Sequence, residues 1–175
     1  RREAEEANPE QDMDTLKKDA RQVELVTEEL NEALKDQREL QAKIDKKEQQ
    51  IHAAHEENDS AAAKVLEAEK DVREAELEVK VAQEKAYRRE LLEIKDKVRG
   101  DAIGASVDEA KRESAEKDVL EKQAKVQYLK ARVDTIRDSA AGDDGALKED
   151  QAKEEATDAN LQYAKAVHEK AKVRL

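Results

Sequence analysis

The stretch that decides the fold runs from residue 16 to residue 58 and reads LKKDARQVELVTEELNEALKDQRELQAKIDKKEQQIHAAHEEN. Apolar side chains recur in it every seven residues and again three residues further on, which is the a and d pattern of a coiled coil. We predict that this seam is the surface that binds a partner helix. The predicted interface residues are Leu16, Val23, Val26, Leu30, Gln37, Leu40, Ile44, Ile51 and Asn58.

Three positions of the heptad pattern are polar, namely Gln37, Lys47 and Asn58. Polar side chains at such positions lower the stability of a coiled coil and can fix its register or its oligomeric state. They are equally compatible with tolerated defects, and the sequence leaves both interpretations open.

The composition of the whole chain indicates long helices. Charged residues make up 45% of the 175 residues and aromatic residues 2%, whereas an ordinary globular domain has about 25% charged residues. Too little bulky apolar material is present for one compact core. Strong helix formers dominate, with only four glycines and one proline, so we expect helices that bury a narrow stripe rather than a disordered chain.

Helix signals extend the pattern in both directions. Residues 1–8 are interpreted as a frayed lead-in, and Asn8 and Pro9 as the cap and first residue of a helix. Neither glycine nor proline follows before Gly100, so the sequence predicts one uninterrupted helix of roughly 90 residues, about 135 Å long. Beyond Asn58 the large seam residues give way to valine and alanine.

Two glycine-containing loops divide the rest of the chain. Gly100 is placed to end a helix, and Ser106 begins a capping box for the next one. Gly142 marks the second loop, which offers an aspartate as the following cap. The predicted helices cover about 59–99, 106–139 and 146–175. The predicted packing face of the last helix is Ala152, Ala156, Ala159, Tyr163, Ala166 and Val173, with Leu161, Ala164 and Leu175 on a flank.

Short loops make neighbouring helices antiparallel. We therefore predict an all-α protein in which a coiled-coil stalk, 9–58, runs into an antiparallel three-helix bundle, 59–175. The resulting elongated rod resembles a spectrin-like segment in its general shape, although the tryptophan typical of that repeat is missing.

No group of residues predicts catalysis, a cofactor or a metal. His52 and His55 share a helix face, but only Glu48 or Glu56 could complete a zinc site beside them. The aspartates at 143 and 144 are explained by helix capping. We expect His168 and the three tyrosines to be packing residues.

Charge and cysteine content limit the partners. The net charge is −11, which disfavours nucleic acid and anionic lipid surfaces. No apolar run is long enough for membrane insertion. No cysteine is present, which is neutral on compartment and slightly favours the cytoplasm.

The predicted function is that of a structural or scaffold protein that binds protein partners through the heptad seam and acts as a rigid spacer. The seam could pair as a homodimer, with a different protein in a heteromeric coiled coil, or with a later part of its own chain. The alternative is a receptor-binding or adhesion module of a larger bacterial surface protein or secreted toxin-like protein.

Overall fold

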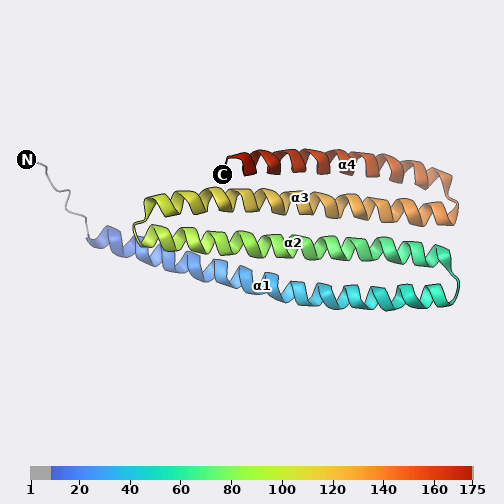
Figure 1. Ribbon diagram of the computed structural model, residues 1–175, viewed down its shortest axis with the longest axis horizontal. Helices are drawn as coiled ribbons and strands as arrows, with labels where there is room; N and C mark the ends of the chain where they lie inside the picture. The colour runs from blue at the N-terminus through green and yellow to red at the C-terminus, as the bar shows by residue number, and fades with distance from the viewer. Residues whose placement is uncertain (1–8, 175) are drawn as a thin grey trace, which may run out of the picture.

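The computed structural model describes residues 9–174, which form four α-helices and no strand (Figure 1). The described chain is therefore all-α, as predicted, and the predicted lead-in at 1–8 lies outside the described residues. The helices are α1 (Pro9–Glu56), α2 (Ser60–Val98), α3 (Ala102–Ala141) and α4 (Asp144–Val173).

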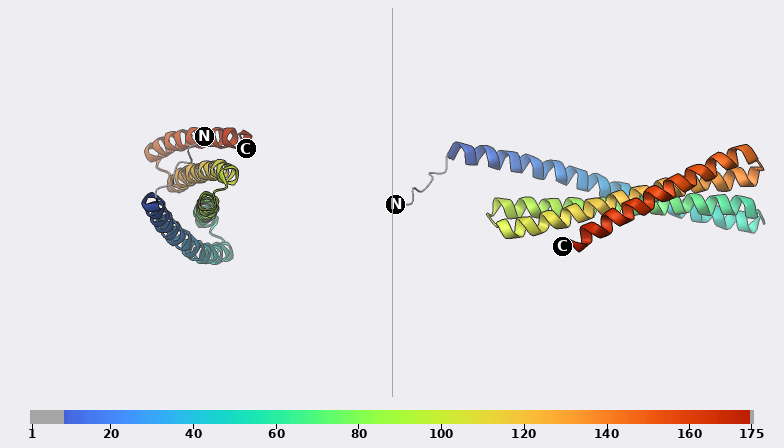
Figure 2. Two further views of the ribbon diagram at one scale, coloured as in Figure 1. Left: turned by 90° about the vertical axis from the view of Figure 1, so that its left-hand side faces the viewer. Right: turned by 90° about the horizontal axis from the view of Figure 1, so that it is seen from above.

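Successive helices are antiparallel and lie side by side in chain order (Figure 1). Within the described chain, each helix packs only against its neighbours in the sequence: α1 against α2, α2 against α3, and α3 against α4. A view along the long axis shows that the helices do not close around a common centre (Figure 2). The packing between neighbours is bundle-like, but the arrangement is an open array similar in principle to a repeat protein.

The prediction of an uninterrupted helix from Pro9 to Gly100 is wrong, because the chain reverses after Glu56. Asn58 adopts a positive φ of 54°, a conformation that asparagine tolerates better than most residues. The Asp59 N–H then donates to the Ala54 carbonyl at 2.9 Å. As a result, α1 lies along α2 instead of projecting as a free stalk.

The three turns share one construction. Each has a residue with positive φ followed by an aspartate, and the aspartate carboxylate accepts a hydrogen bond from the backbone N–H three residues later. The three turns are Asn58-Asp59 capped onto Ala62, Gly100-Asp101 onto Gly104, and Gly142-Asp143 onto Ala146. These turns are equally spaced along the sequence. The two repeat units between these turns, α2 and α3 each with the turn that follows it, therefore have the same length.

The start of α3 differs from the prediction. A loop was expected up to residue 105 with a capping box at Ser106, but the helix begins at Ala102. The reason is that the Asp101 carboxylate accepts a hydrogen bond from the Gly104 N–H at 2.8 Å. This cap satisfies a backbone donor that otherwise lacks a helical partner, and it brings Gly104 into the first turn.

α4 packs through the flank of the predicted face and not through its centre. Leu161 and His168 are its buried residues and lie against α3. The predicted face, which includes Ala156, Ala159 and Tyr163, is exposed to solvent. α4 carries two stripes at helical spacing, and periodicity alone does not say which of them packs.

The core is a series of thin layers between neighbouring helices. Ala68 and Val72 of α2 pack on Val133 of α3, and Ala75 and Val79 pack on Val126. Small side chains at these contacts allow helix axes to approach closely.

We expect Gly142→Ala to lower the free energy of unfolding by about 1–2 kcal/mol, because alanine is strained at positive φ. The φ of Gly142 is 72° and a Cβ there meets no atom within 4 Å, so the cost comes from the backbone alone. Urea denaturation of Gly142→Ala beside Gly142→Asn measures it. The asparagine variant should lose less, and equal stability of all three proteins would contradict the described turn.

Candidate functional site

The predicted interface residues lie mainly between α1 and α2 of the same chain. Val26, Leu30, Leu40 and Ile44 are buried, and α2 is the helix that packs on α1. Of the partners that the sequence left open, a later part of the same chain is the one that covers this seam in the structure.

The other predicted interface residues have different surroundings. Leu16 and Val23 are exposed, toward the beginning of α1, where α1 diverges from the other helices (Figure 2). Ile51 is half-buried and Asn58 forms the turn. Gln37 donates a hydrogen bond to the Glu84 carboxylate at 2.7 Å, so this polar seam residue has a specific partner on α2.

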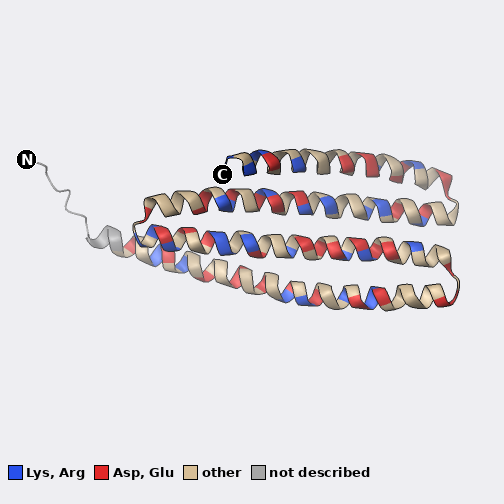
Figure 3. Ribbon diagram, viewed as in Figure 1, with Lys and Arg blue, Asp and Glu red and all other residues tan. Residues whose placement is uncertain are grey.

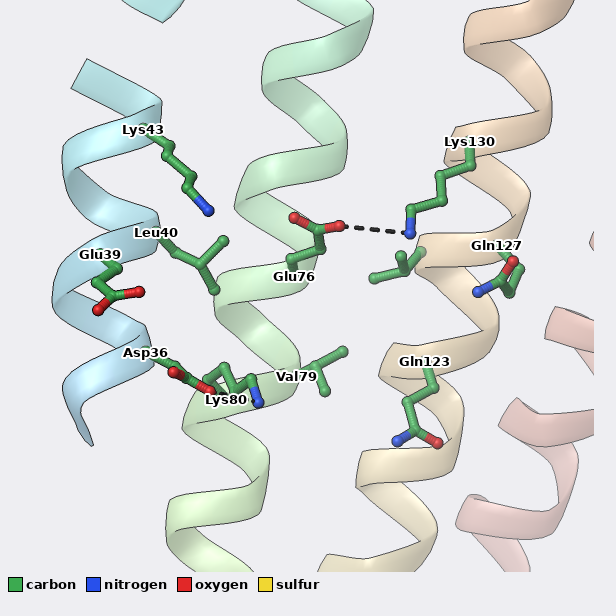
Figure 4. A pocket seen from close by; sticks show the side chains of 11 residues that line it. Asp36, Glu39, Leu40, Lys43, Glu76, Val79, Lys80, Gln123, Gln127 and Lys130 are labelled. Carbon is green, nitrogen blue, oxygen red and sulfur yellow. Dashed lines mark ion pairs between the residues drawn. The ribbon is translucent and has the colours of Figure 1, made fainter. Parts of the chain in front are cut away.

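A groove over α2, with α1 and α3 on its two sides, combines apolar and charged lining (Figure 4). It has a volume of about 350 Å³. Its apolar lining comes from one residue of each helix, Leu40, Val79 and Val126. A second, more polar hollow of about 620 Å³ adjoins it and shares Glu76, Gln127 and Lys130.

Charged side chains of the groove pair with each other across the helices. Lys80 lies 2.8 Å from Asp36 of α1, and Lys130 of α3 lies 3.4 Å from Glu76 (Figure 4). These pairs join all three helices, and they occupy the charged groups that a small ligand would need. The paired groups of the groove therefore contribute to cohesion between the three helices.

Glu69 connects three helices in the second hollow. Its carboxylate accepts hydrogen bonds from Lys47 of α1 at 2.5 Å and from Arg137 of α3 at 3.0 Å. The bond from Lys47 is the main reason why the pKa of Glu69 lies below its ordinary value, and partial burial opposes it. Lys47, one of the polar seam residues, thus has a defined structural role.

A buried ion pair lies where α2 approaches the start of α3. Glu93 is buried, and its carboxylate accepts a hydrogen bond from the Arg112 Nε at 2.7 Å and another from Lys97. Burial raises the pKa of Glu93, but the bonds from Lys97 and Arg112 outweigh it and leave the pKa below the ordinary value. The bond to Glu93 likewise raises the pKa of the Arg112 guanidinium.

His168 is buried between α4 and α3, in keeping with a packing role. Its Nδ1 lies 2.5 Å from a carboxylate oxygen of Glu121 and 3.6 Å from one of Asp118. These three side chains are close enough together to hold a metal ion. His168 and Asp118 line a pocket that also has four cationic residues in its lining, and their charge disfavours a divalent cation there. These residues are Lys85, Arg89, Lys111 and Lys172. The geometry fits a hydrogen-bonded histidine–carboxylate pair.

His52 and His55, the other histidines, are both exposed and face carboxylates. His52 lies 3.5 Å from Glu56, and His55 lies 3.3 Å from Glu67 of α2. The two histidines therefore contact different acidic groups and do not converge on one point.

Comparison of the chain with protein-family models, with curated proteins and with solved structures gives no match. Among residues 9–174, no helix combines the length and the apolar character that crossing a membrane requires.

We expect Ile44→Ala to cost about 2–4 kcal/mol of unfolding free energy, because it removes a buried side chain from the α1–α2 contact. Ile44 is 4% exposed, whereas Leu16 is 53% exposed. Leu16→Ala is therefore the matched control and should cost less than about 1 kcal/mol. Chemical denaturation compares the two variants, and similar losses would show that α2 does not cover the seam as described.

We expect Glu93→Gln to lower stability at neutral pH by about 1–3 kcal/mol, because charge-assisted hydrogen bonds are lost. A carboxyl group whose pKa is lowered in the folded state stabilises the fold at pH values above its ordinary pKa. This contribution disappears as the pH falls through the folded-state pKa. When the pH is lowered from neutral to below about 4, the free energy of unfolding of Glu93→Gln should therefore fall less than that of the parent.

Glu116→Gln is the control for this measurement. Glu116 binds the same Arg112, but its side chain is 49% exposed, against 6% for Glu93, so its removal should change stability little. Thermal unfolding of both variants across this pH range gives the comparison. Equal pH dependence in Glu93→Gln and the parent would contradict the role given to Glu93.

Proposed function

We propose that this protein is a structural scaffold, a rod of antiparallel helices that acts as a rigid spacer and associates with protein partners by helix packing. The observation that carries the proposal is the open array, in which every helix among the described residues packs only on its sequence neighbours. Such an array buries a contact layer between each pair of helices and leaves long helical faces available for protein contacts.

Ion pairs between helices support the rigidity of this rod. Glu69 joins α1, α2 and α3 through Lys47 and Arg137, and Glu78 of α2 pairs with Lys125 of α3 at 2.9 Å. Networks in which one group holds two partners lose less side-chain entropy per contact than separate pairs. The array is thus fixed at several points along its length.

The heptad pattern of residues 16–58 supports treating α1 and α2 as an antiparallel coiled coil, and the rod-like, spectrin-like shape is part of the same proposal. A cytoplasmic location is proposed on the lack of cysteine. The alternative, a receptor-binding or adhesion module, stays a prediction.

The spacer role predicts a fixed distance between α1 and α4, which do not contact each other. Because the chain has no cysteine, Lys46→Cys with Glu155→Cys places two spin labels on exposed positions of these helices. Double electron–electron resonance should give one narrow distance distribution. Dilution with unlabelled protein removes any signal between molecules.

Lys35→Cys with Gln50→Cys is the control, since both positions lie on α1 and are about 22 Å apart along the helix. It measures the width contributed by the labels alone. A distribution between α1 and α4 that is much broader than this control, or that has several maxima, would rule out a rigid spacer.

A further inference from the structure

The outer stripe of α4 is a row of exposed residues with the spacing of a coiled-coil seam. It consists of residues spaced alternately four and three apart, all exposed: Ala152, Ala156, Ala159, Tyr163 and Ala166, with Val173 one heptad further on. Tyr163 is 73% exposed, which is unusual for one of only three aromatic residues in the chain. No described helix covers this stripe.

Residues at the equivalent positions of α1, α2 and α3 contact the helix that follows. One layer of contacts recurs between each pair of neighbouring helices, and its two partners have the same sequence separation each time. Gln37 of α1 contacts Glu84 of α2, Val79 of α2 packs on Val126 of α3, and Glu121 of α3 contacts His168 of α4. The next residue in this series is Tyr163.

The rest of the stripe follows the same rule. The residues two repeat units earlier, on α2, are those that face α3, and Ala68, Val72, Ala75 and Val79 among them are buried there. Each helix thus uses one set of positions to contact the helix that follows it. On α4 the same set is exposed and consists of Ala152, Ala156, Ala159, Tyr163 and Ala166.

The opposite end of the array cannot supply that helix. The later helices contact the helix before them through one set of positions in the repeat unit. The equivalent positions on α1 are all exposed, and only one of them is apolar. They are Glu24, Glu28, Asn31, Lys35, Arg38, Ala42, Asp45, Gln49 and His52. This polar face closes the array at α1, so α4 of one copy has no matching apolar stripe on α1 of another.

The distribution of charge along α4 indicates which helix fits against its outer stripe. Residues 144–159 carry six acidic and two basic groups, whereas residues 160–174 carry one acidic and four basic groups. The acidic half lies near the turn from α3 and the basic half near the end of the described chain (Figure 3). Two α4 helices in antiparallel orientation place opposite charges against each other, and a parallel pair would place like charges together.

We propose that two copies of this chain pair through their α4 helices, antiparallel and related by a two-fold axis. The alanines let the two helices approach closely, and Tyr163 of each copy covers alanines in the first half of the other α4. The product is a continuous array of eight helices with the polar face of α1 at both ends. The inference names a partner for the proposed scaffold and thus rests on that function.

Sedimentation equilibrium of the full chain should show a monomer–dimer equilibrium in the micromolar range, since one helix pair is a small interface. Ala159→Arg should give a monomer over the same concentrations. Ala159 is exposed in the single chain, so circular dichroism and the melting temperature of the isolated variant should match those of the monomeric parent. Ala42→Arg, an exposed alanine on the outer face of α1, should dimerise like the parent.

Three results would overturn the proposal: a parent that is monomeric throughout, an Ala159→Arg variant that still dimerises, or an Ala42→Arg variant that does not. The first two leave the α1–α4 distance measurement unaffected, so a failure of the dimer and a failure of the rigid spacer can be told apart.

Orientation is tested with one spin label per chain. In the antiparallel dimer, labels at Gln162→Cys lie close to the two-fold axis and should be less than about 20 Å apart. Labels at Lys148→Cys lie far from the axis, and about 40 Å should separate them. Short distances at both positions would indicate a parallel pair and contradict the two-fold arrangement.

Discussion

The turn between helices combines a residue of positive φ with an aspartate that caps the next helix. This pair of residues ends one helix, reverses the chain and satisfies one of the free N–H groups in the first turn of the next helix. Because the three turns are equally spaced, the two units between them have the same length. Equal lengths keep the contact stripes of successive helices in phase, so the packing of each pair depends on the placement of these turns.

Because the contact stripes of successive helices stay in phase, a chain with so few large apolar residues can form an ordered structure. Alanine and valine bury little area each, so one helix contact is weak and stability must accumulate along helices of 30 to 48 residues. Polar layers such as Gln37 with Glu84, and Glu121 with His168, alternate with the apolar layer of Val79 and Val126. Such specific pairs disfavour a slip of one helix along its neighbour.

Sequence patterns were sufficient for helices and glycines but not for the path of the chain. Composition predicted an all-α protein, and Gly100 and Gly142 marked two of the three turns. Asn58 was missed as a turn because the heptad pattern of residues 16–58 continues up to it, and because asparagine is a weaker signal of positive φ than glycine. The equal spacing of Asn58, Gly100 and Gly142 would have revealed it.

The same spacing would have corrected the candidate site. Periodicity identified Val26, Leu30, Leu40 and Ile44 as contact residues, but a heptad carries no information on which helix covers it. For α4 it marked the stripe of Ala156, Ala159 and Tyr163 without showing that α3 occupies the other stripe. His168 and Glu121 have the same sequence separation as Gln37 and Glu84, and only this comparison places them in one layer.

The outer faces of α1 and α4 differ in polarity, and under the proposed pairing this difference would limit how many copies associate. If the outer face of α1 were as apolar as that of α4, copies would stack head to tail without limit, because a contact between unlike surfaces closes only by symmetry around a ring. Charged and amide side chains on α1, such as Glu28, Arg38 and Gln49, prevent that contact. In the proposed dimer the apolar stripe of α4 contacts the same stripe of a second copy, and such a contact between like surfaces is complete after two copies.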